Sequence, residues 1–146
     1  MHSIQRSVLV PYRCEQMFDL VADVARYPEF MPWCGGTDVQ WQNEHGMQAT
    51  VQIRFAGIRQ SFTTRNDHSY PHRIVFHLVD GPFSSLTGDW DFQALGEDGC
   101  KVVYTMEYAF SSRAMSAVIG PVFNRIATSF IDSFTQRARA VYGSPR

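Results

Sequence analysis

Apolar and polar residues alternate over much of the chain, a pattern that predicts β-strands with one buried face. A first strand carries Ile4, Val8 and Val10 on its buried face and ends at Pro11. From residue 37 to residue 110 the pattern predicts a meander of strands, separated by turns rich in Gly, Pro and Asp. Gly88 in mid-strand predicts a bulge or a bend. The side chains expected to face inward occupy every second position of five further strands, within 47–55, 58–64, 74–78, 86–94 and 104–110.

Two segments change to helical spacing, the first of them directly after the first strand. Between residues 17 and 24 apolar side chains recur at three- and four-residue steps, which predicts a short amphipathic helix. Tyr27 is expected to end it, because the following Pro28 disfavours helical geometry in its predecessor. An elbow of aromatic and proline residues follows at 30–33.

The second helical segment is an apolar stripe of unusual length, which runs from Met115 through Val118 to Val141. Pro121 predicts a kink in this helix or the start of its main part. A lone helix this apolar needs a partner, and the concave face of the sheet is the only one large enough. The order of elements predicts a single α+β domain over residues 1–146, with short helices after the first strand and a curved antiparallel sheet of six or seven strands wrapped on the long helix.

Composition narrows the class of protein. Aromatic residues make up 14% of the 146 residues and charged ones only 18%, so the aromatic bulk needs a large interior or a cavity to line. The longest apolar run, 114–123, is shorter than the ~18 residues that span a bilayer, and the N-terminus has no unbroken apolar stretch. We expect a cytoplasmic protein.

The three cysteines Cys14, Cys34 and Cys100 are widely spaced and are expected to be reduced and structural.

The charged residues are unevenly spread. The net charge of −1 argues against strong attraction of the whole molecule to DNA or other nucleic acid. Between residues 51 and 79, however, four arginines face a single acid, Asp67, and from residue 111 onward five arginines face Asp132 alone. This distribution is typical of a basic face that can contact RNA phosphates, and equally of solvated arginines on outer surfaces.

No catalytic signature stands out. The histidines lie in predicted loops, at the terminus or on an outward strand position and not on a predicted helix, which argues against a helical zinc site, and no serine or cysteine lies in a known nucleophile motif. Asp89 and Asp91 share the polar face of a strand, an arrangement that fits either general acid–base catalysis or two solvated surface carboxylates. We therefore expect a protein that is not an enzyme, has no metal site and requires no cofactor.

The inward aromatic residues fit either a solid core or the lining of a cavity. Geometry favours a cavity, because a long helix across a curved sheet touches it near the middle and gapes at one end. The turn 80–83 is predicted to present Phe83 at the mouth of this hollow, where it would gate entry with Phe30 and Trp33. The candidate ligand-binding residues are Phe30, Trp33, Val51, Ile53, Phe55, Phe62, Phe76, Leu78, Phe83, Trp90, Tyr104, Met106, Phe123, Ile126 and Phe130.

Several short motifs spread over nearly the whole chain resemble one known family. They are Leu9-Val10-Pro11-Tyr12, Tyr27-Pro28-Glu29-Phe30, Pro32-Trp33-Cys34, Phe62-Thr63-Thr64-Arg65-Asn66, Leu78-Val79-Asp80-Gly81-Pro82-Phe83 and Arg137-Ala138. The chain resembles the ribosome-association toxin and coenzyme Q-binding protein group of the START-like, helix-grip superfamily. One departure is Arg13, where that family more often has a Ser-like helix cap, so the first helix is expected to start less firmly here.

The resemblance implies a helix-grip fold with a lipid-sized cavity and no catalytic machinery, and it leaves three hypotheses. The first is a ubiquinone-like lipid bound between the sheet and the helix segment 118–134, with peripheral membrane contact, in support of respiration. The second is binding to the large ribosomal subunit, which would block subunit joining. The third is a polyketide cyclase-like enzyme that would use Gln60, Thr64, Tyr104 and Tyr108. The candidate RNA contacts of the second hypothesis are Arg54, Arg59, Arg65, Arg73, Arg137 and Arg139.

Overall fold

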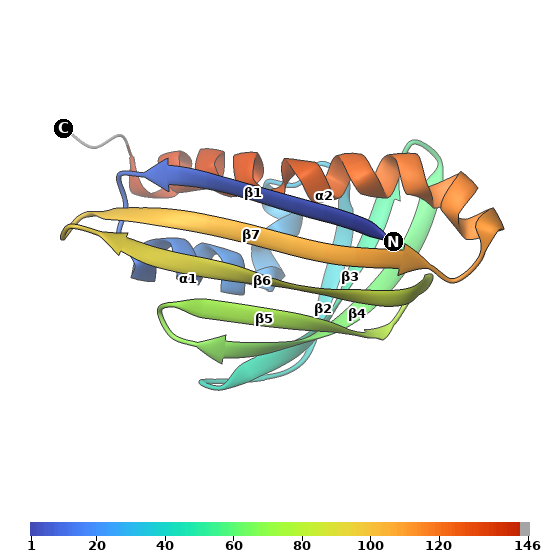
Figure 1. Cartoon of the computed structure of the whole chain (residues 1–146), viewed down its shortest axis with the longest axis horizontal. Coiled ribbons are helices and arrows are strands. Elements are labelled where there is room, and N and C mark those ends of the chain that lie inside the picture. The colour runs from blue at the N-terminus through green and yellow to red at the C-terminus, as the bar shows by residue number, and fades with distance from the viewer. Residues whose placement is uncertain (144–146) are drawn as a thin grey trace.

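A seven-stranded antiparallel sheet forms the body of the protein in the computed structural model, which describes residues 1–143 (Figure 1). The strands lie in the order β1-β7-β6-β5-β4-β3-β2. The predicted curved antiparallel sheet and long C-terminal helix are confirmed. The strand bounds are β1 His2–Val10, β2 Cys34–Asn43, β3 Gly46–Phe55, β4 Ile58–Ser69, β5 Arg73–Asp80, β6 Phe83–Leu95 and β7 Gly99–Phe110.

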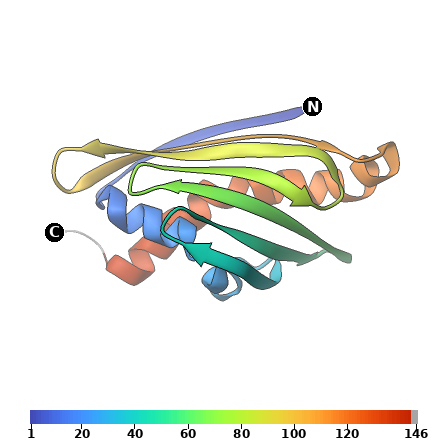
Figure 2. The same cartoon turned by 90° about the horizontal axis from the view of Figure 1, so that it is seen from below.

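Three helices, α1 Cys14–Ala22, η1 Val24–Glu29 and α2 Arg113–Tyr142, complete the fold. α1 and α2 lie on the same side of the curved sheet (Figure 2). The single helix predicted to reach Tyr27 is wrong, because Asp23 leaves helical geometry (φ −84°, ψ 67°) and divides α1 from the 3₁₀ helix η1. Arg13 offers α1 no capping side chain, and the backbone N–H of Arg13 donates instead to Gln16 Oε1 at 2.9 Å.

α2 is one uninterrupted helix of 30 residues. Ser112 caps its start, where Ser112 Oγ accepts from the Met115 backbone at 3.1 Å. The helix therefore begins eight residues before Pro121, which lies inside it on the exposed side, so Pro121 does not mark its start. Two predicted members of the apolar stripe are wrong, since Val118 and Val141 are 60% and 49% exposed. They fall at the margins of a buried stripe that consists of Ile119, Phe123, Ile126, Ala127, Ile131, Phe134 and Ala138.

By length and by its mean hydropathy of 1.2 over 18 residues, α2 would also suit a membrane-crossing helix. Here its apolar side belongs to the hydrophobic core that the sheet and α1 share. The C-terminal end of α2 is tied by two tyrosines to α1 and to the segment that precedes α1. Tyr142 Oη donates to the Gln16 carbonyl at 3.0 Å, and Tyr12 Oη donates to the Gly143 carbonyl at 2.7 Å. These contacts hold α1 and α2 together over one end of the sheet.

The opposite end of the sheet–helix interface is filled with aromatic rings. Phe123, fully buried on α2, has its ring centroid 4.8 Å from those of Phe83 and Tyr108. Tyr108 Oη donates to Asn124 Oδ1 at 3.0 Å. Phe62 packs edge-on against Phe83 and Phe123, each at 6.0 Å. This end is a solid core.

Candidate functional site

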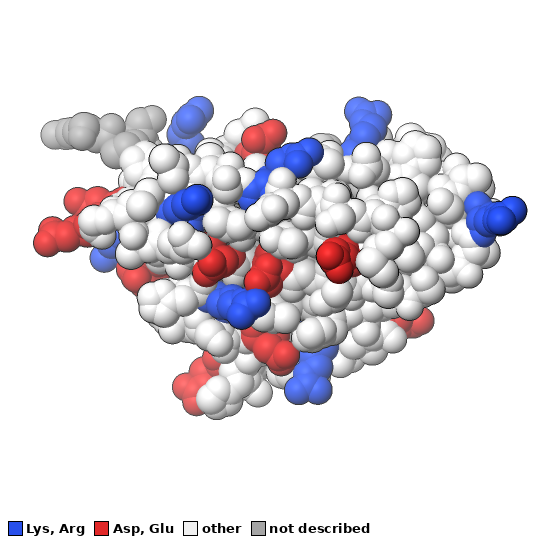
Figure 3. Space-filling model, in the orientation of Figure 1, with Lys and Arg blue, Asp and Glu red and all other residues white. Residues whose placement is uncertain are grey.

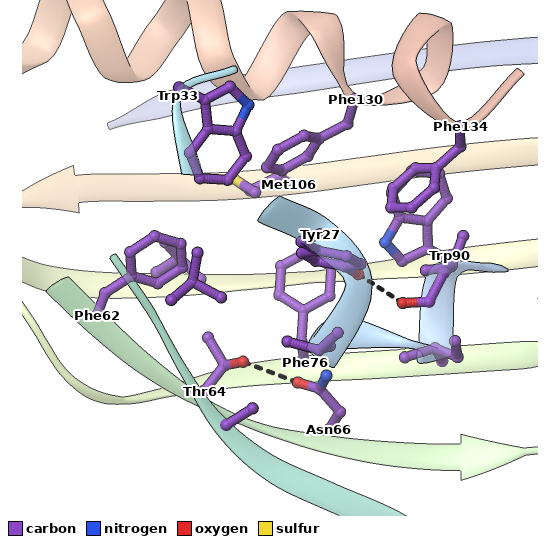
Figure 4. A pocket seen from close by; sticks show the side chains of 16 residues that line it. Tyr27, Trp33, Phe62, Thr64, Asn66, Phe76, Trp90, Met106, Phe130 and Phe134 are labelled. Carbon is purple, nitrogen blue, oxygen red and sulfur yellow. Dashed lines mark hydrogen bonds between the residues drawn. The ribbon is translucent and has the colours of Figure 1, made fainter. Parts of the chain in front are cut away.

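A cavity of about 80 Å³ lies between the inner face of the sheet and the C-terminal half of α2 (Figure 4). η1 and the end of α1 close it from the side, where they contribute Tyr27, Val24 and Val21. Rings and aliphatic side chains make up nearly all of its wall. The lining residues are Val21, Val24, Tyr27, Trp33, Ala49, Val51, Phe62, Thr64, Asn66, Ile74, Phe76, Leu86, Trp90, Met106, Phe130 and Phe134.

About half of the predicted ligand-binding residues line this cavity. They are Trp33, Val51, Phe62, Phe76, Trp90, Met106 and Phe130. The others are not part of its wall: Phe30, Ile53, Phe55, Leu78, Phe83, Tyr104, Phe123 and Ile126.

Sequence reasoning missed Asn66 and Phe134, among others. Asn66 follows Thr64 at the next inward position of β4, so alternation alone could have found it. Phe134 lies within the apolar stripe predicted between Met115 and Val141. The spacing of that stripe does not tell which of its rings face the cavity.

Gly88 shapes the wall of the cavity. Of the bulge or bend predicted at Gly88, the bulge is wrong, because Gly88 pairs regularly with Phe76 on one side and Met106 on the other; the irregularity in β6 lies between Phe83 and Ser85. A Cβ at Gly88 would come within 2.5 Å of the Phe76 ring and 2.2 Å of the Thr105 carbonyl oxygen. The glycine therefore serves close approach, and it lets the Phe76 ring lie across β6.

Phe83 and Phe30 lie in different parts of the molecule. Phe83 is 5% exposed and belongs to the solid aromatic end described above; it packs behind the lining residue Phe62 and is not itself part of the cavity wall. Phe30 packs against Phe134 at 5.7 Å, and the Arg137 guanidinium lies 4.9 Å over its ring. Arg137 Nη2 also donates to Glu29 Oε1 at 3.0 Å. The structure therefore does not bring Phe83 together with Phe30 at one mouth, and Phe30 covers η1 and Phe134 from outside.

The polar groups of the cavity wall are few. Thr64 Oγ1 donates to Asn66 Oδ1 at 2.9 Å (Figure 4). Tyr27 Oη donates to the Val21 carbonyl, and burial raises the pKa of Tyr27 well above its ordinary value. No Asp, Glu, Lys, Arg or His is among the described residues that line the cavity. The interior of the site is thus neutral at physiological pH.

The arginines of the outer face fall into two groups. Arg65 pairs with Asp67 at 3.7 Å, and Arg73 pairs with Asp89 at 2.7 Å. On the face drawn in Figure 3, basic and acidic side chains are interspersed. Three of the six candidate RNA contacts, Arg65, Arg73 and Arg137, are therefore paired with carboxylates. Of the C-terminal arginines, Arg137 is bound to Glu29, and Arg146 lies outside the described residues.

The remaining group lies at the tip of the β3–β4 hairpin. Arg54 and Arg59 are directly opposite in register, and within residues 1–143 neither has an acidic partner within 4.0 Å. Arg125 reaches the same tip from α2, where its guanidinium lies 5.8 Å over the Phe55 ring. Like charges directly opposite destabilise a sheet, so this tip favours an anionic partner. We call Arg54, Arg59 and Arg125 the tip arginines.

Two further details support the tip as a contact surface. The Arg54 side chain lies over Gly35 of β2, where an added Cβ would be 3.0 Å from Arg54 Cβ. A shallow surface groove around the arginines is lined by polar side chains that can donate or accept hydrogen bonds. Its lining residues are Gln52, Ile53, Arg54, Arg59, Gln60 and Ser61.

The candidate catalytic residues Asp89, Asp91 and Tyr104 each interact with a neighbouring side chain. Asp89 is bound to Arg73, and Asp91 accepts from Gln93 at 2.8 Å. Tyr104 Oη faces Met106 Sδ at 3.6 Å, and burial raises the pKa of Tyr104 well above its ordinary value. Within residues 1–143 no three His, Cys, Asp or Glu side chains gather in a group that could hold a metal ion.

Comparison with known proteins places this geometry in context. The family of polyketide cyclase / dehydrase and lipid transport proteins matches residues 10–135. The ribosome association toxin RatA of Vibrio cholerae is 46% identical over 143 residues, which cover 98% of this chain and 99% of that protein. The mitochondrial coenzyme Q-binding protein COQ10 of Drosophila melanogaster is 26% identical over 141 residues, which cover 94% of this chain and 58% of that protein.

Solved structures agree on the fold. The Zhui aromatase/cyclase from a Streptomyces species superposes with a TM-score of 0.82 at 15% identity, over 99% of both chains. An 18 kDa protein from Caulobacter crescentus superposes with a TM-score of 0.74 at 31% identity, over 99% of this chain and 100% of that one. The chain therefore belongs to the polyketide cyclase / dehydrase and lipid transport family and, within it, to the family of the ribosome association toxins.

Proposed function

We propose that this protein binds the large ribosomal subunit and hinders its joining with the small subunit. One observation carries the proposal: a protein named ribosome association toxin is 46% identical over 98% of this chain. This reverses the order of the two main hypotheses drawn from the sequence. The lipid hypothesis is supported by a relative of 26% identity, whereas the ribosomal hypothesis is supported by several relatives of 38% identity or more.

The tip arginines are the surface that suits such a partner. Ribosomal RNA presents a dense array of phosphates, and cationic side chains without local acids can neutralise them without reading any base sequence. Arg54 and Arg59 lie opposite each other on the outer face of the hairpin, and Arg125 approaches the same tip from the inner face, where its guanidinium lies over the Phe55 ring. The polar groove beside them offers Gln and Ser side chains, which hydrogen-bond phosphate and sugar oxygens. Arg65 and Arg73 are already paired with acids and contribute less.

Co-sedimentation with purified bacterial large subunits at low salt tests this proposal. Exchange of both Arg54→Gln and Arg59→Gln removes two charges and keeps a polar, hydrogen-bonding side chain at each position. We expect at least about tenfold weaker co-sedimentation, because two phosphate contacts are lost. The matched control is the pair Arg65→Gln and Arg73→Gln, which removes the same charge from the same outer face.

Far-UV circular dichroism must show that both double variants remain folded. Equal losses in the two variants would show that net charge matters and the tip does not. If the unaltered protein stays out of the large-subunit fraction even at low salt, the ribosomal function itself is wrong.

A second candidate function is the binding of a hydrophobic ligand such as a ubiquinone-like lipid. It is favoured by the neutral, ring-lined cavity beneath α2 and by the relative named as a coenzyme Q-binding protein. Apolar pockets with a few placed polar groups are typical small-molecule sites, and since such sites hold about 300–1,000 Å³, a ligand would have to displace side chains of this cavity of about 80 Å³. Native mass spectrometry of protein purified from cells with intact lipids tests it. Adducts that extract as a neutral lipid support binding, and empty protein that takes up no quinone on titration contradicts it.

We propose no catalytic step for this chain. The titratable group in the described cavity wall is the Tyr27 phenol, and its hydroxyl is held by the Val21 carbonyl. A cyclase would need a group that moves protons to or from the folding substrate. Thr64, the one hydroxyl of the cyclase hypothesis that lines the cavity, is engaged with Asn66.

A further inference from the structure

Two of the three cysteines meet in the core, at the end of the sheet that α1 covers. Cys14 is the first residue of α1, and Cys100 begins the inward row of β7. Their sulfur atoms lie 3.0 Å apart, although 86 positions separate them in the sequence. We propose that Cys14 and Cys100 form a redox-sensitive pair, which peroxide closes into a disulfide that locks α1 onto the sheet.

The connection between β1 and α1 brings the two cysteines together. Val10, the last residue of β1, is the register partner of Cys100 on β7. The chain turns over the inner face of the sheet at residues 11–13 and starts α1 at Cys14. The third cysteine, Cys34, lies on β2, at the opposite edge of the sheet from β1. The pair is therefore a product of the fold, and Cys34 has no part in it.

The distance between the two sulfur atoms leaves little to move. A disulfide bond measures about 2.05 Å, so the two atoms have to approach by about 1 Å. Both thiols are nearly closed to water, with exposed fractions of 4% for Cys14 and 0% for Cys100. A link between them therefore needs no rearrangement of the core, but an oxidant needs a way in.

Cys14 is the thiol that an oxidant reaches first. It lies in the first turn of α1, where Arg13 offers no capping side chain, and a helix end without a cap opens more readily than a central strand. Cys100 lies on β7, which is paired on both sides, and burial raises the pKa of the Cys100 thiol. Cys100 therefore stays a thiol while Cys14 reacts, and it meets the oxidised Cys14 when the turn closes again.

The chemistry consumes one molecule of hydrogen peroxide. Peroxide transfers an oxygen atom to the Cys14 sulfur, which gives a sulfenic acid and one water. The Cys100 sulfur then attacks the sulfenic sulfur, and the S–S bond forms as the S–O bond breaks. The hydroxyl group leaves with the Cys100 proton as a second water. The two sulfur atoms together lose two electrons, and the peroxide gains them.

The disulfide has two physical consequences. It ties the start of α1 to β7 covalently, and because the end of α1 and η1 close one side of the cavity, oxidation fixes that wall in place. It also closes a long loop in the unfolded chain, which lowers the entropy of that state and stabilises the fold.

Peroxide treatment of the folded full chain, followed by denaturation and alkylation with iodoacetamide, tests the pair by intact mass spectrometry. The reduced chain takes up three alkyl groups, and we expect the treated chain to take up one, on Cys34. Peptide mapping should identify the link between Cys14 and Cys100, and dithiothreitol should restore all three sites. The treated chain should gain at least about 5 °C in Tm, and hydrogen exchange in α1 should slow.

Two variants and a control assign the effect to its residues. Cys14→Ala and Cys100→Ala each remove one partner, so neither should show the link or the rise in Tm on treatment. Cys34→Ala removes the third buried cysteine and is the matched control, which should form the link and gain the same rise. Circular dichroism before treatment shows that each variant is folded, and if one of the two partner variants fails to fold, the other still decides.

Three results would overturn the proposal. The first is a folded, peroxide-treated chain that still takes up three alkyl groups. The second is a sulfinic acid on Cys14 with no link to Cys100, since the pair would then fail to close before further oxidation. The third is a link that joins two chains instead of closing within one. A link within the chain that leaves Tm and hydrogen exchange in α1 unchanged would contradict the locking of α1.

Discussion

The same two strands carry both candidate sites, one on each face. On the inner face of β3 and β4, Val51 and Phe62 are opposite in register and line the neutral cavity. On the outer face, three residues further along β3, Arg54 opposes Arg59 at the hairpin tip. Because successive side chains on a strand point to opposite faces, two sites of unlike chemistry fit within one hairpin.

The difference between the two faces lies in charge and water. The inner site is dry and uncharged, so its binding depends on buried apolar area and on a few hydrogen bonds. The outer site is exposed and cationic, so its binding depends on counterion release. One backbone hydrogen bond links the two sites, in which the Arg54 N–H donates to the Trp33 carbonyl at 2.8 Å. Substitutions should therefore separate the two activities.

The largest expected effect comes from the introduction of a charge on each face in turn. Val51→Asp places a carboxylate in the cavity wall, where no described residue can pair with it, and should lower the free energy of unfolding by about 3–5 kcal/mol. The neighbouring Gln52→Asp, exposed on the outer face, should change it by less than about 0.5 kcal/mol. Urea denaturation followed by circular dichroism measures both. Similar losses in the two variants would contradict the assignment of the faces.

A smaller effect separates the sites by salt. If the three tip arginines each neutralise one phosphate, ribosome affinity should fall about 40-fold between 50 and 200 mM salt. The triple variant Arg54→Gln, Arg59→Gln and Arg125→Gln should show a flatter dependence, measured by sedimentation at several salt concentrations. Binding of a neutral quinone in the cavity should stay constant over the same range. A ribosome affinity that does not depend on salt would argue against phosphate contacts.

The smallest effect concerns His68, which continues the inward row of β4 beyond Asn66. Its Nε2 is buried without a partner among the described residues, and burial lowers the pKa of His68, opposed by Asp67. Because the folded pKa lies below the unfolded one, the unfolded chain binds the proton first, and stability is lost as the pH falls below about 6.5.

His68→Gln should therefore lose less stability than the unaltered protein between pH 7.5 and pH 5.5 in urea denaturation. His72→Gln, at an exposed position, is the control and should follow the unaltered protein. If the His68 variant and the unaltered protein show the same pH dependence, protonation of the His68 imidazole does not destabilise the folded state.

Most of the fold could be predicted from the sequence because its strands alternate cleanly. β3 repeats buried and outward residues over its whole length, and the turn at Ala56-Gly57 has the positive φ angles that a tight hairpin needs. The edge strand β2 gave no comparable pattern, since most of its residues are exposed. A strand with both faces partly in water has no apolar row to reveal it.

The site was less predictable than the fold. Alternation identifies inward residues, but it does not tell a ring that faces a void from one that packs against another ring, as Phe76 and Phe83 show. Likewise, an arginine count does not tell which guanidinium meets an acid. The sequence around Arg73 and Arg59 does not distinguish them. The pairing of the strands brings Asp89 to within 2.7 Å of Arg73 and places Arg59 opposite Arg54. Both distinctions depend on contacts between distant segments.

The most direct test of the account is a cryo-electron microscopy map of the large ribosomal subunit with this protein bound at low salt. We expect the β3–β4 hairpin tip to face ribosomal RNA, with the guanidinium groups of Arg54, Arg59 and Arg125 within about 4 Å of phosphate oxygens. The α2 side that covers the cavity should remain folded against the sheet. Density that places another face of the protein on the subunit, or a subunit with no bound protein at saturating concentration, would contradict it.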